Sequence, residues 1–220
     1  MNEKLKKIHA YLMSRGTSEK ALLAADKSSV YLAMEIMEYA HKDQKRENGE
    51  EYANHPARCL VTYRDLIGLS PEGNGNIDED LICRYRVPFK GVQEVCLLHD
   101  VVEDTEFTLE DIKDIYTECG LEEYFIMYIE DALTRITHDK TVDYADYIKI
   151  CLRNPISALV KMLDLNDNLN VLSLTRYDEE RYHRAQGYLF YTLIINDAYH
   201  FVECANEYRN ALNEDKLLTN

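Results

Sequence analysis

Proline and glycine are scarce in this sequence, with four and eight residues respectively among 220. Both residues interrupt regular secondary structure, so their scarcity argues against a protein built of many short strands and tight turns. Good helix formers such as Leu, Ala, Glu and Lys are abundant instead. The composition therefore predicts an all-α protein, and the length favours one domain spanning residues 1–220.

Positive charge is also in short supply. The chain carries 25 Lys and Arg residues against 40 Asp and Glu residues, which gives a formal net charge of −15. Such a field repels nucleic acids and anionic membranes, so we expect neither as a partner. An anionic substrate is compatible with this charge provided that a metal ion or a local basic cluster overrides the field.

Paired cysteines and long apolar runs are absent. None of the six cysteines belongs to a C-x-x-C pair, which argues against a zinc knuckle or a disulfide framework and favours reduced thiols in a cytoplasmic protein. The apolar stretch GYLFYTLII, residues 187–195, is too short to span a bilayer. The basic segment 1–16 lacks the uninterrupted apolar core of a signal peptide.

Apolar residues recur at helical spacing along most of the chain. Thr108 is a typical N-cap, and Asn154-Pro155 is a second strong start signal. The segment 69–91 is the exception, because it holds three of the eight glycines and two of the four prolines; we expect an irregular insertion into the helical bundle there. The predicted helices span 3–14, 18–40 with a break at 26–29, 56–68, 91–104, 109–119, 121–136, 142–152, 155–172 and 178–212.

The stretch HDVVED, residues 99–104, ends an apolar helix with one imidazole and three carboxylates. On an ideal helix, His99, Asp100, Glu103 and Asp104 lie within an arc of about 140°. Three close carboxylates repel one another strongly in a low dielectric. Either a divalent cation or full exposure to water would remove that cost.

A second group of polar residues interrupts the apolar stretch ALVKMLDLNDNL, residues 158–169. Asp164 and Asn168 lie four residues apart on one helical face, and Lys161 lies one turn before Asp164. A carboxylate in so apolar a helix is hard to explain as a surface residue. We therefore interpret Asp164 as a functional side chain.

The third stretch is HKDQKRENGEEYANHP, residues 41–56, which places three cations in an acidic protein and ends where a helix begins. Its His55 could join His99, Asp100 and Asp164 in a set of two histidines and two carboxylates. That mixture suits Mn(II), Fe(II), Co(II) or Zn(II) and leaves coordination positions open for water.

These three stretches resemble the HD superfamily of metal-dependent phosphohydrolases, and more closely the (p)ppGpp-hydrolase domain of RelA/SpoT proteins and its stand-alone small relatives. The family pattern A-H-x-x-Q-x-R-x-x-G-x-x-Y-x-x-H-P corresponds to AHKDQKRENGEEYANHP, L-L-H-D-x-x-E-D-T to LLHDVVEDT, and K-x-x-D-x-x-x-N-L to KMLDLNDNL. The matches occur in order and span residues 40–169. The interval between His55 and His99 is longer than in the family, and Asn170 stands where a basic residue is frequent.

The resemblance implies an HD-domain helical bundle that removes the 3′-pyrophosphate of guanosine tetra- or pentaphosphate, giving GDP or GTP and pyrophosphate. It implies one bound Mn(II), or another divalent transition metal, and two carboxylates that position and deprotonate the attacking water. Nearby basic side chains would neutralise charge on the phosphoryl oxygens. The implied residues are His55, His99, Asp100 and Asp164 as metal ligands, Glu103 and Asp104 as catalytic carboxylates, and Lys45, Arg46, Lys161 and Asn168 as substrate contacts.

Other interpretations stay open. The same site could act on another phosphorylated nucleotide, such as NADPH or a nucleotide with a plain 3′-phosphate, and the insertion at 69–91 could form a lid or reshape the pocket. A non-catalytic helical regulatory protein with a vestigial site is a third alternative. We interpret His41 as a structural residue behind the site, His9 as a surface or satisfied helix histidine, and the Tyr-rich last helix as a core or oligomer-forming helix.

Overall fold

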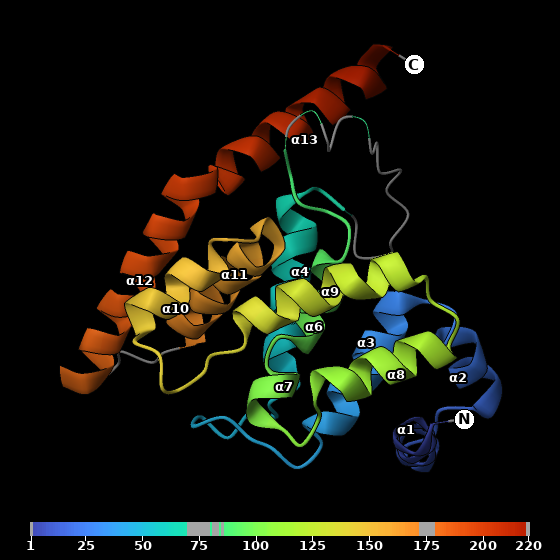
Figure 1. Cartoon of the computed structure of the whole chain (residues 1–220). Helices are drawn as coiled ribbons and strands as arrows, with labels where there is room; N and C mark the ends of the chain where they lie inside the picture. The colour runs from blue at the N-terminus through green and yellow to red at the C-terminus, as the bar shows by residue number, and fades with distance from the viewer. Residues whose placement is uncertain (1, 70–79, 81–83, 85, 172–178, 219–220) are drawn as a thin grey trace.

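The computed structural model describes residues 2–69, 80, 84, 86–171 and 179–218 of the chain (Figure 1). Within these ranges the chain is helical, and its only β-type pairing is an isolated antiparallel bridge between Lys45 and Glu51. The prediction of an all-α protein is confirmed. The helices are α1 (Glu3–Ser14), α2 (Glu19–Ala25), α3 (Ser29–Ala40), α4 (Asn54–Leu66), α6 (Val92–Leu98), α7 (Val101–Asp104), α8 (Leu109–Glu118), α9 (Glu123–Ile136), α10 (Tyr144–Cys151), α11 (Pro155–Val171), α12 (Glu179–Tyr199) and α13 (Phe201–Leu218).

Capping side chains explain where two of these helices begin. At α8, the Thr108 hydroxyl accepts from the backbone N–H of Asp111 at 3.2 Å, and the Asp111 carboxylate accepts from the N–H of Thr108 at 2.8 Å. This reciprocal pair satisfies two of the N–H groups that every helix start leaves unpaired. At α11, the Asn154 side-chain oxygen accepts from the N–H groups of Ile156 and Ser157. Both predicted helix starts are confirmed.

Helix α11 is the central element of the bundle and packs against α4, α6, α9, α10 and α12 (Figure 1). Its residues Ala158, Leu159, Val160 and Leu163 are at most 4% exposed. Burial of a side chain as large as leucine stabilises the fold by roughly 2 kcal/mol. Because α4 also packs on α6, three segments that are far apart in the sequence meet along α11.

The predicted single helix over 91–104 is wrong, because the structure divides it into α6 and α7 with a turn at His99 and Asp100. In a continuous helix the carbonyl of Cys96 would accept from the N–H four residues later. Here the imidazole Nδ1 of His99 binds that carbonyl at 2.8 Å. A side chain that competes for a backbone acceptor favours the end of a helix. The turn sets both side chains beside α4.

The predicted single helix over 178–212 is also wrong. The structure divides it into α12 and α13 at His200, whose φ of +52° lies in the left-handed region. Asn196 Oδ1 accepts from the N–H of Val202 across the break, and the rings of Tyr199 and Phe201 stack at 4.8 Å. Among the described helices, none is long and apolar enough to cross a membrane.

Most of the predicted insertion at 69–91 lies outside the described residues, so its role as a lid or pocket wall stays a prediction. The described chain continues from residue 86 to Gly91, which precedes α6 with a φ of +84°. A Cβ at Gly91 would lie 3.6 Å from the side chain of Ile129, which is ordinary packing. The backbone conformation, rather than space, therefore favours glycine there.

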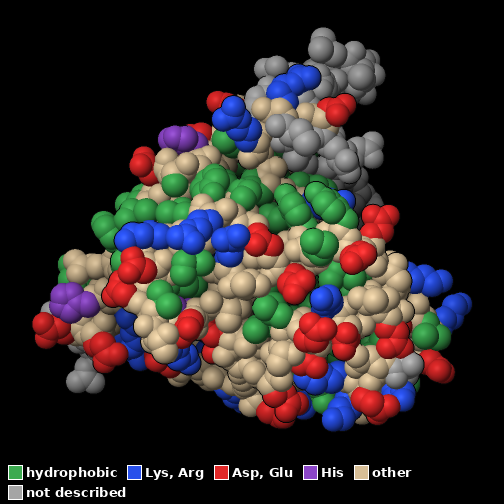
Figure 2. Space-filling model, viewed as in Figure 1, with side chains coloured by type: hydrophobic (Ala, Val, Ile, Leu, Met, Phe, Trp, Pro, Cys, Tyr) green, Lys and Arg blue, Asp and Glu red, His purple; other side chains and the backbone are tan. Residues whose placement is uncertain are grey.

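Helix α12 is apolar on two sides. It packs on α11 and buries Ala185 and Ile195, yet it also exposes Leu189, Phe190 and Leu193 by 49–60%. Figure 2 shows apolar side chains gathered over the upper half of the molecule and many acidic side chains over the lower half. One side of α12 is therefore part of the core, as predicted. A role of its exposed apolar side in oligomer formation stays a prediction.

Candidate active site

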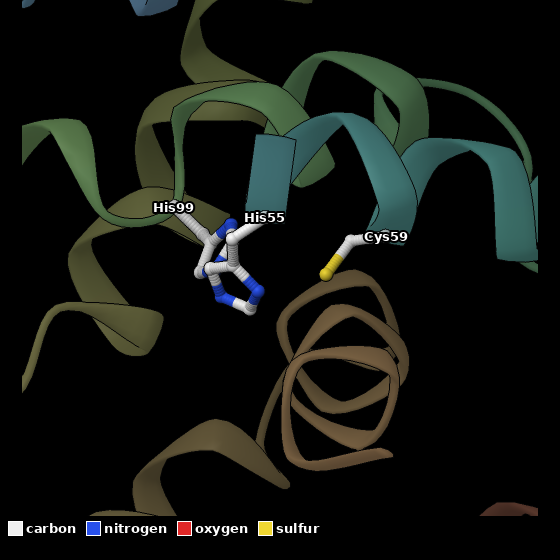
Figure 3. Close-up of side chains that lie close together, drawn as sticks. All are labelled: His55, Cys59 and His99. Atoms are coloured by element: carbon white, nitrogen blue, oxygen red, sulfur yellow. The ribbon is translucent and has the colours of Figure 1, made fainter. Parts of the chain in front are cut away.

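The four predicted metal ligands meet at one point, although they come from three separate elements. His55 lies in the first turn of α4, His99 and Asp100 lie in the turn after α6, and Asp164 lies in the middle of α11. His55 Nε2 is 3.1 Å from Asp164 Oδ1 and 3.4 Å from Asp100 Oδ2, and His99 Nε2 is 3.3 Å from Asp100 Oδ1. Figure 3 shows the two imidazoles close together, and their rings meet edge to face with centres 5.2 Å apart.

The orientation of the two imidazoles requires positive charge between them. His55 Nδ1 is bound by Asp167 at 2.7 Å, and His99 Nδ1 by the carbonyl of Cys96 at 2.8 Å. A neutral imidazole that donates through Nδ1 has a lone pair on Nε2. The two Nε2 atoms lie only 3.3 Å apart, with two carboxylates around them. Separations of 3.1–3.4 Å between donor atoms match the edges of a coordination shell with bonds of about 2.1 Å, so these residues fit a divalent cation.

The pKa values of His55 and Asp164 also indicate that this cluster binds a positive charge. Burial disfavours a charged imidazole, but hydrogen bonds to Asp164 and Asp167 outweigh it and raise the pKa of His55 to about 9. Burial likewise opposes ionisation of Asp164, but Lys161 and His55 hold the pKa of that carboxyl well below its usual range. Without a metal, a proton therefore occupies the space that a divalent cation would take.

Lys161 binds Asp164 directly. Its ammonium lies 2.7 Å from Asp164 Oδ2, with only 13% of the side chain exposed, and 5.2 Å from the centre of the Tyr147 ring. Asn168 Nδ2 donates to the other oxygen, Asp164 Oδ1, at 2.5 Å. Asp164 is thereby held from both sides. The predicted contact of Lys161 and Asn168 with a substrate stays a prediction.

Asp167 was not identified from the sequence, yet it organises one side of the site. It is 6% exposed, and its carboxylate binds His55 Nδ1, Arg58 Nε at 2.6 Å and Arg46 Nη1 at 3.3 Å. Burial opposes its ionisation, but hydrogen bonds from His55 and Arg58 lower its pKa to about 2. Its position three residues after Asp164 in an apolar helix was the available signal, since the same argument had singled out Asp164.

The two predicted catalytic carboxylates have different surroundings. Glu103 is half-buried, and its Oε2 accepts from the backbone N–H of His138 at 2.9 Å. Burial raises the pKa of Glu103, although the His138 N–H and the Lys161 charge oppose the shift. Asp104 is exposed, and its Oδ2 lies 2.8 Å from the hydroxyl of Tyr52. Glu103 is therefore the carboxylate better suited to accept a proton near neutral pH.

Tyr52 is a fixed position of the family pattern to which the sequence analysis gave no role. Its hydroxyl lies 2.9 Å from Asp100 Oδ2 as well as 2.8 Å from Asp104, and its single proton can serve one of them at a time. The ring stacks on the buried His41 imidazole at 4.7 Å. His41 Nδ1 and Gln44 Oε1 are 2.6 Å apart, and Gln44 donates to the backbone of Asp104 at 2.7 Å. This placement behind the site agrees with the structural role predicted for His41.

The two basic contacts predicted in the loop before α4, Lys45 and Arg46, differ in placement. The Arg46 guanidinium binds Asp167 and the side-chain oxygen of Asn168, with 17% of its side chain exposed. It therefore reaches the edge of the site from the loop before α4. Lys45 is exposed, and within the described part of the chain its ammonium forms no ion pair with the cluster. Contact of either with a substrate stays a prediction.

Cys59 lies one turn along α4 from His55 and close to both imidazoles (Figure 3). Burial raises the pKa of this thiol well above its usual range, and the charge of Asp164 raises it further. A thiol binds a metal as thiolate, which this acidic environment disfavours. The carboxylates therefore stay the predicted ligands, and we interpret Cys59 as a packing residue.

With this geometry established, comparison with known proteins is informative. No family model matches the chain. It is 26% identical over 163 residues to the guanosine-3′,5′-bis(diphosphate) 3′-pyrophosphohydrolase MESH1 of Drosophila melanogaster, covering 67% of this chain and 75% of that protein. It is 25% identical over 154 residues to the enzyme of that name from Aquifex aeolicus, covering 68% of this chain, and 30% identical over 118 residues to that of Borreliella burgdorferi, covering 53%. The matches cover only 18% and 14% of these two bacterial relatives.

A solved structure agrees with these relatives. The structure of a metazoan ortholog of SpoT that hydrolyses ppGpp superposes with a TM-score of 0.52 at 18% identity, over 84% of this chain and 95% of that one. The resemblance to the (p)ppGpp hydrolases is confirmed. At this identity the structural likeness establishes the HD-type fold and not the activity, which rests on the site.

Proposed function

We propose that this protein is a metal-dependent hydrolase that removes the 3′-pyrophosphate of (p)ppGpp and releases GDP or GTP and pyrophosphate. The observation that carries the proposal is the meeting of His55, His99, Asp100 and Asp164 at separations that fit one divalent cation. The named activity of the three relatives supports the substrate. Arg46 and Lys161 bring positive charge to the edge of this site in a chain of net charge −15, which supports an anionic substrate at this place.

We further propose Mn(II) as the bound ion, because two imidazoles and two carboxylates are a donor set of intermediate hardness. A divalent ion there polarises a phosphoryl oxygen and lowers the pKa of water. His55 and His99 offer Nε2, since their Nδ1 atoms are already bound by Asp167 and the carbonyl of Cys96. Such outer contacts fix the orientation of the ligand rings.

Glu103 is the proposed general base. Its raised pKa keeps it basic enough to take a proton from the water that attacks the 3′-phosphorus, and its bond to the N–H of His138 fixes its direction. We propose that Asp104, together with the Tyr52 hydroxyl, orients that water from the exposed side. The bond between that phosphorus and the ribose 3′-oxygen breaks, and this oxygen takes up the proton that Glu103 accepted from water to become the 3′-hydroxyl of GDP or GTP.

The proposed substrate contacts are Lys45, Arg46, Lys161 and Asn168. Arg46 reaches the edge of the site beside Asn168, where its guanidinium can bind a phosphate or the base. Lys161, bound to Asp164, places a fixed positive charge beside the reacting phosphoryl group. Lys45 is exposed, so its contribution is attraction of the nucleotide at longer range.

A product assay tests the proposal. Protein stripped with chelator and reloaded with Mn(II) is incubated with ppGpp, and GDP and pyrophosphate are quantified. We expect turnover that is lost by roughly 10²–10⁴-fold in Glu103→Gln and retained in the matched exposed control Glu106→Gln. NADPH and a 3′-phosphonucleotide serve as competing substrates. Faster turnover of either would redirect the assignment, and no turnover of any nucleotide by metal-loaded protein would support a non-catalytic role.

A further inference from the structure

A second group of metal-ligand side chains lies away from the candidate active site, between the first three helices. His9 of α1 is buried, and its Nε2 lies 3.0 Å from Oδ1 of Asp26, the residue that ends α2. The same nitrogen lies 3.8 Å from Oε2 of Glu35, which belongs to α3. Three helices therefore direct one nitrogen and two carboxylate oxygens to a common point. Of the two interpretations of His9, a surface residue is wrong, because His9 is a buried histidine of α1 that binds Asp26.

The carboxylate of Glu35 is buried, and part of its hydrogen-bonding capacity is unused within the described part of the chain. Its side chain is 10% exposed, and among the described residues its buried Oε2 has no hydrogen-bond partner. Burial, together with the charges of Asp26 and Glu38, raises the pKa of Glu35 to about 7. A buried carboxylate oxygen without a partner costs free energy. This oxygen points toward His9 and Asp26, where a cation would satisfy it.

We propose that His9, Asp26 and Glu35 form a second, structural site for zinc or a similar divalent transition metal. Imidazole nitrogen and carboxylate oxygen are both zinc ligands, and three protein ligands leave the fourth position of the tetrahedron for water. For bonds of about 2.0–2.1 Å, the donor atoms of a tetrahedron are about 3.3–3.4 Å apart. The two distances at His9 Nε2, 3.0 and 3.8 Å, bracket this value.

The site would join the N-terminal helices to the body of the protein. Helices α1 and α2 contact each other, and α1 packs on α3, whereas α3 packs on α6. Helix α3 ends at Ala40, and the next residue, His41, stacks on Tyr52 in the wall of the active site. A metal shared by α1, α2 and α3 therefore fixes the helix that leads directly to that wall.

The test counts zinc in a protein that lacks the first site. A His55→Ala/His99→Ala background is stripped with chelator, dialysed against zinc chloride, and its zinc content and thermal midpoint are measured. We expect one zinc per chain and a rise in the midpoint on zinc addition. Adding Glu35→Gln should weaken zinc binding by at least tenfold and abolish the rise, whereas Glu38→Gln, an exposed neighbour on α3, should change neither.

Two results would overturn the proposal: a background variant that binds no zinc, or zinc binding that Glu35→Gln leaves unchanged. Circular dichroism establishes that each variant is folded. If Glu35→Gln does not fold, Asp26→Asn replaces it, with the same loss expected. Because zinc is counted without any nucleotide, the result does not depend on the proposed hydrolase activity.

Discussion

Replacing Asp167 by asparagine tests how the site holds its metal. Asp167→Asn keeps the shape of the side chain but removes the charge that binds His55 Nδ1 at 2.7 Å and Arg58 Nε at 2.6 Å. Loss of a carboxylate behind a metal-bound histidine typically weakens metal binding by about 10–100-fold. This corresponds to about 1.4–2.7 kcal/mol. We therefore expect a weaker Mn(II) complex with all four ligands still present.

The same substitution has a separate effect on stability. The pKa of Asp167 is lowered from 3.8 to about 2, a difference of about 1.8 units, and each unit corresponds to about 1.4 kcal/mol. A carboxylate with a depressed pKa stabilises the fold above about pH 4, and this contribution is lost as the pH falls toward 2. Metal-free Asp167→Asn should therefore unfold more easily than the wild type by about 2 kcal/mol at neutral pH. The difference should shrink in acid.

Two assays measure these effects. Calorimetric titration with Mn(II) gives the affinity, and urea unfolding in chelator between pH 2 and 7 gives the free energy of unfolding. Asn170→Ala, on the exposed part of the same helix, serves as the control and should match the wild type. If Asp167→Asn bound Mn(II) as tightly as the wild type, Asp167 would not orient His55, and the reasoning on the outer contacts would fail.

Three further substitutions follow from the same geometry. Lys161→Met leaves the buried Asp164 carboxylate without its cation, so metal-free protein should lose about 3–5 kcal/mol of unfolding free energy, and Mn(II) should restore part of it; equal losses with and without Mn(II) would contradict this. Tyr52→Phe removes the hydroxyl shared by two acidic side chains, so kcat should fall while the Mn(II) content stays at one per chain; an unchanged kcat would exclude the hydroxyl from catalysis. Glu35→Gln removes a carboxyl whose pKa is raised from 4.5 to about 7. Because of this raised pKa, the metal-free wild type should lose up to about 3 kcal/mol of unfolding free energy as the pH rises from 4.5 to about 7. Urea unfolding at pH 4–8 should show the variant gaining on the wild type over this range, and a constant difference would contradict the assignment.

Features encoded by a few neighbouring residues were predictable from the sequence. Thr108 with Asp111, and Asn154 before Pro155, mark helix starts because the capping groups lie within three residues of each other. The breaks at His99 and His200 were missed because each depends on contacts that periodicity does not register. At His99 the deciding contact is the hydrogen bond between its imidazole and the carbonyl of Cys96. At His200 it is the hydrogen bond from the N–H of Val202 to Asn196 Oδ1, which accompanies the positive φ of His200.

The active site was only partly accessible to sequence reasoning. Composition and spacing indicated that Asp164 and the group around His99 were unusual and that His55 could join them, and the family resemblance then implied these four residues as ligands of one ion. Asp167 escaped notice, and Tyr52 received no role although the family pattern contains it, because their contacts join segments that are far apart in the sequence. For the same reason His9 could not be recognised as a buried partner of residues on two other helices.

The central claim is that one divalent ion, held by His55, His99, Asp100 and Asp164, supports removal of a 3′-pyrophosphate. The most direct measurement is the yield of GDP and pyrophosphate from ppGpp, determined together with the Mn(II) content of the same sample. We predict that reloading stripped protein with one Mn(II) at this site restores release of both products in equal amounts, and that His99→Ala abolishes it. Release by His99→Ala at the wild-type rate, or no release by wild-type protein that holds its Mn(II), would contradict the account.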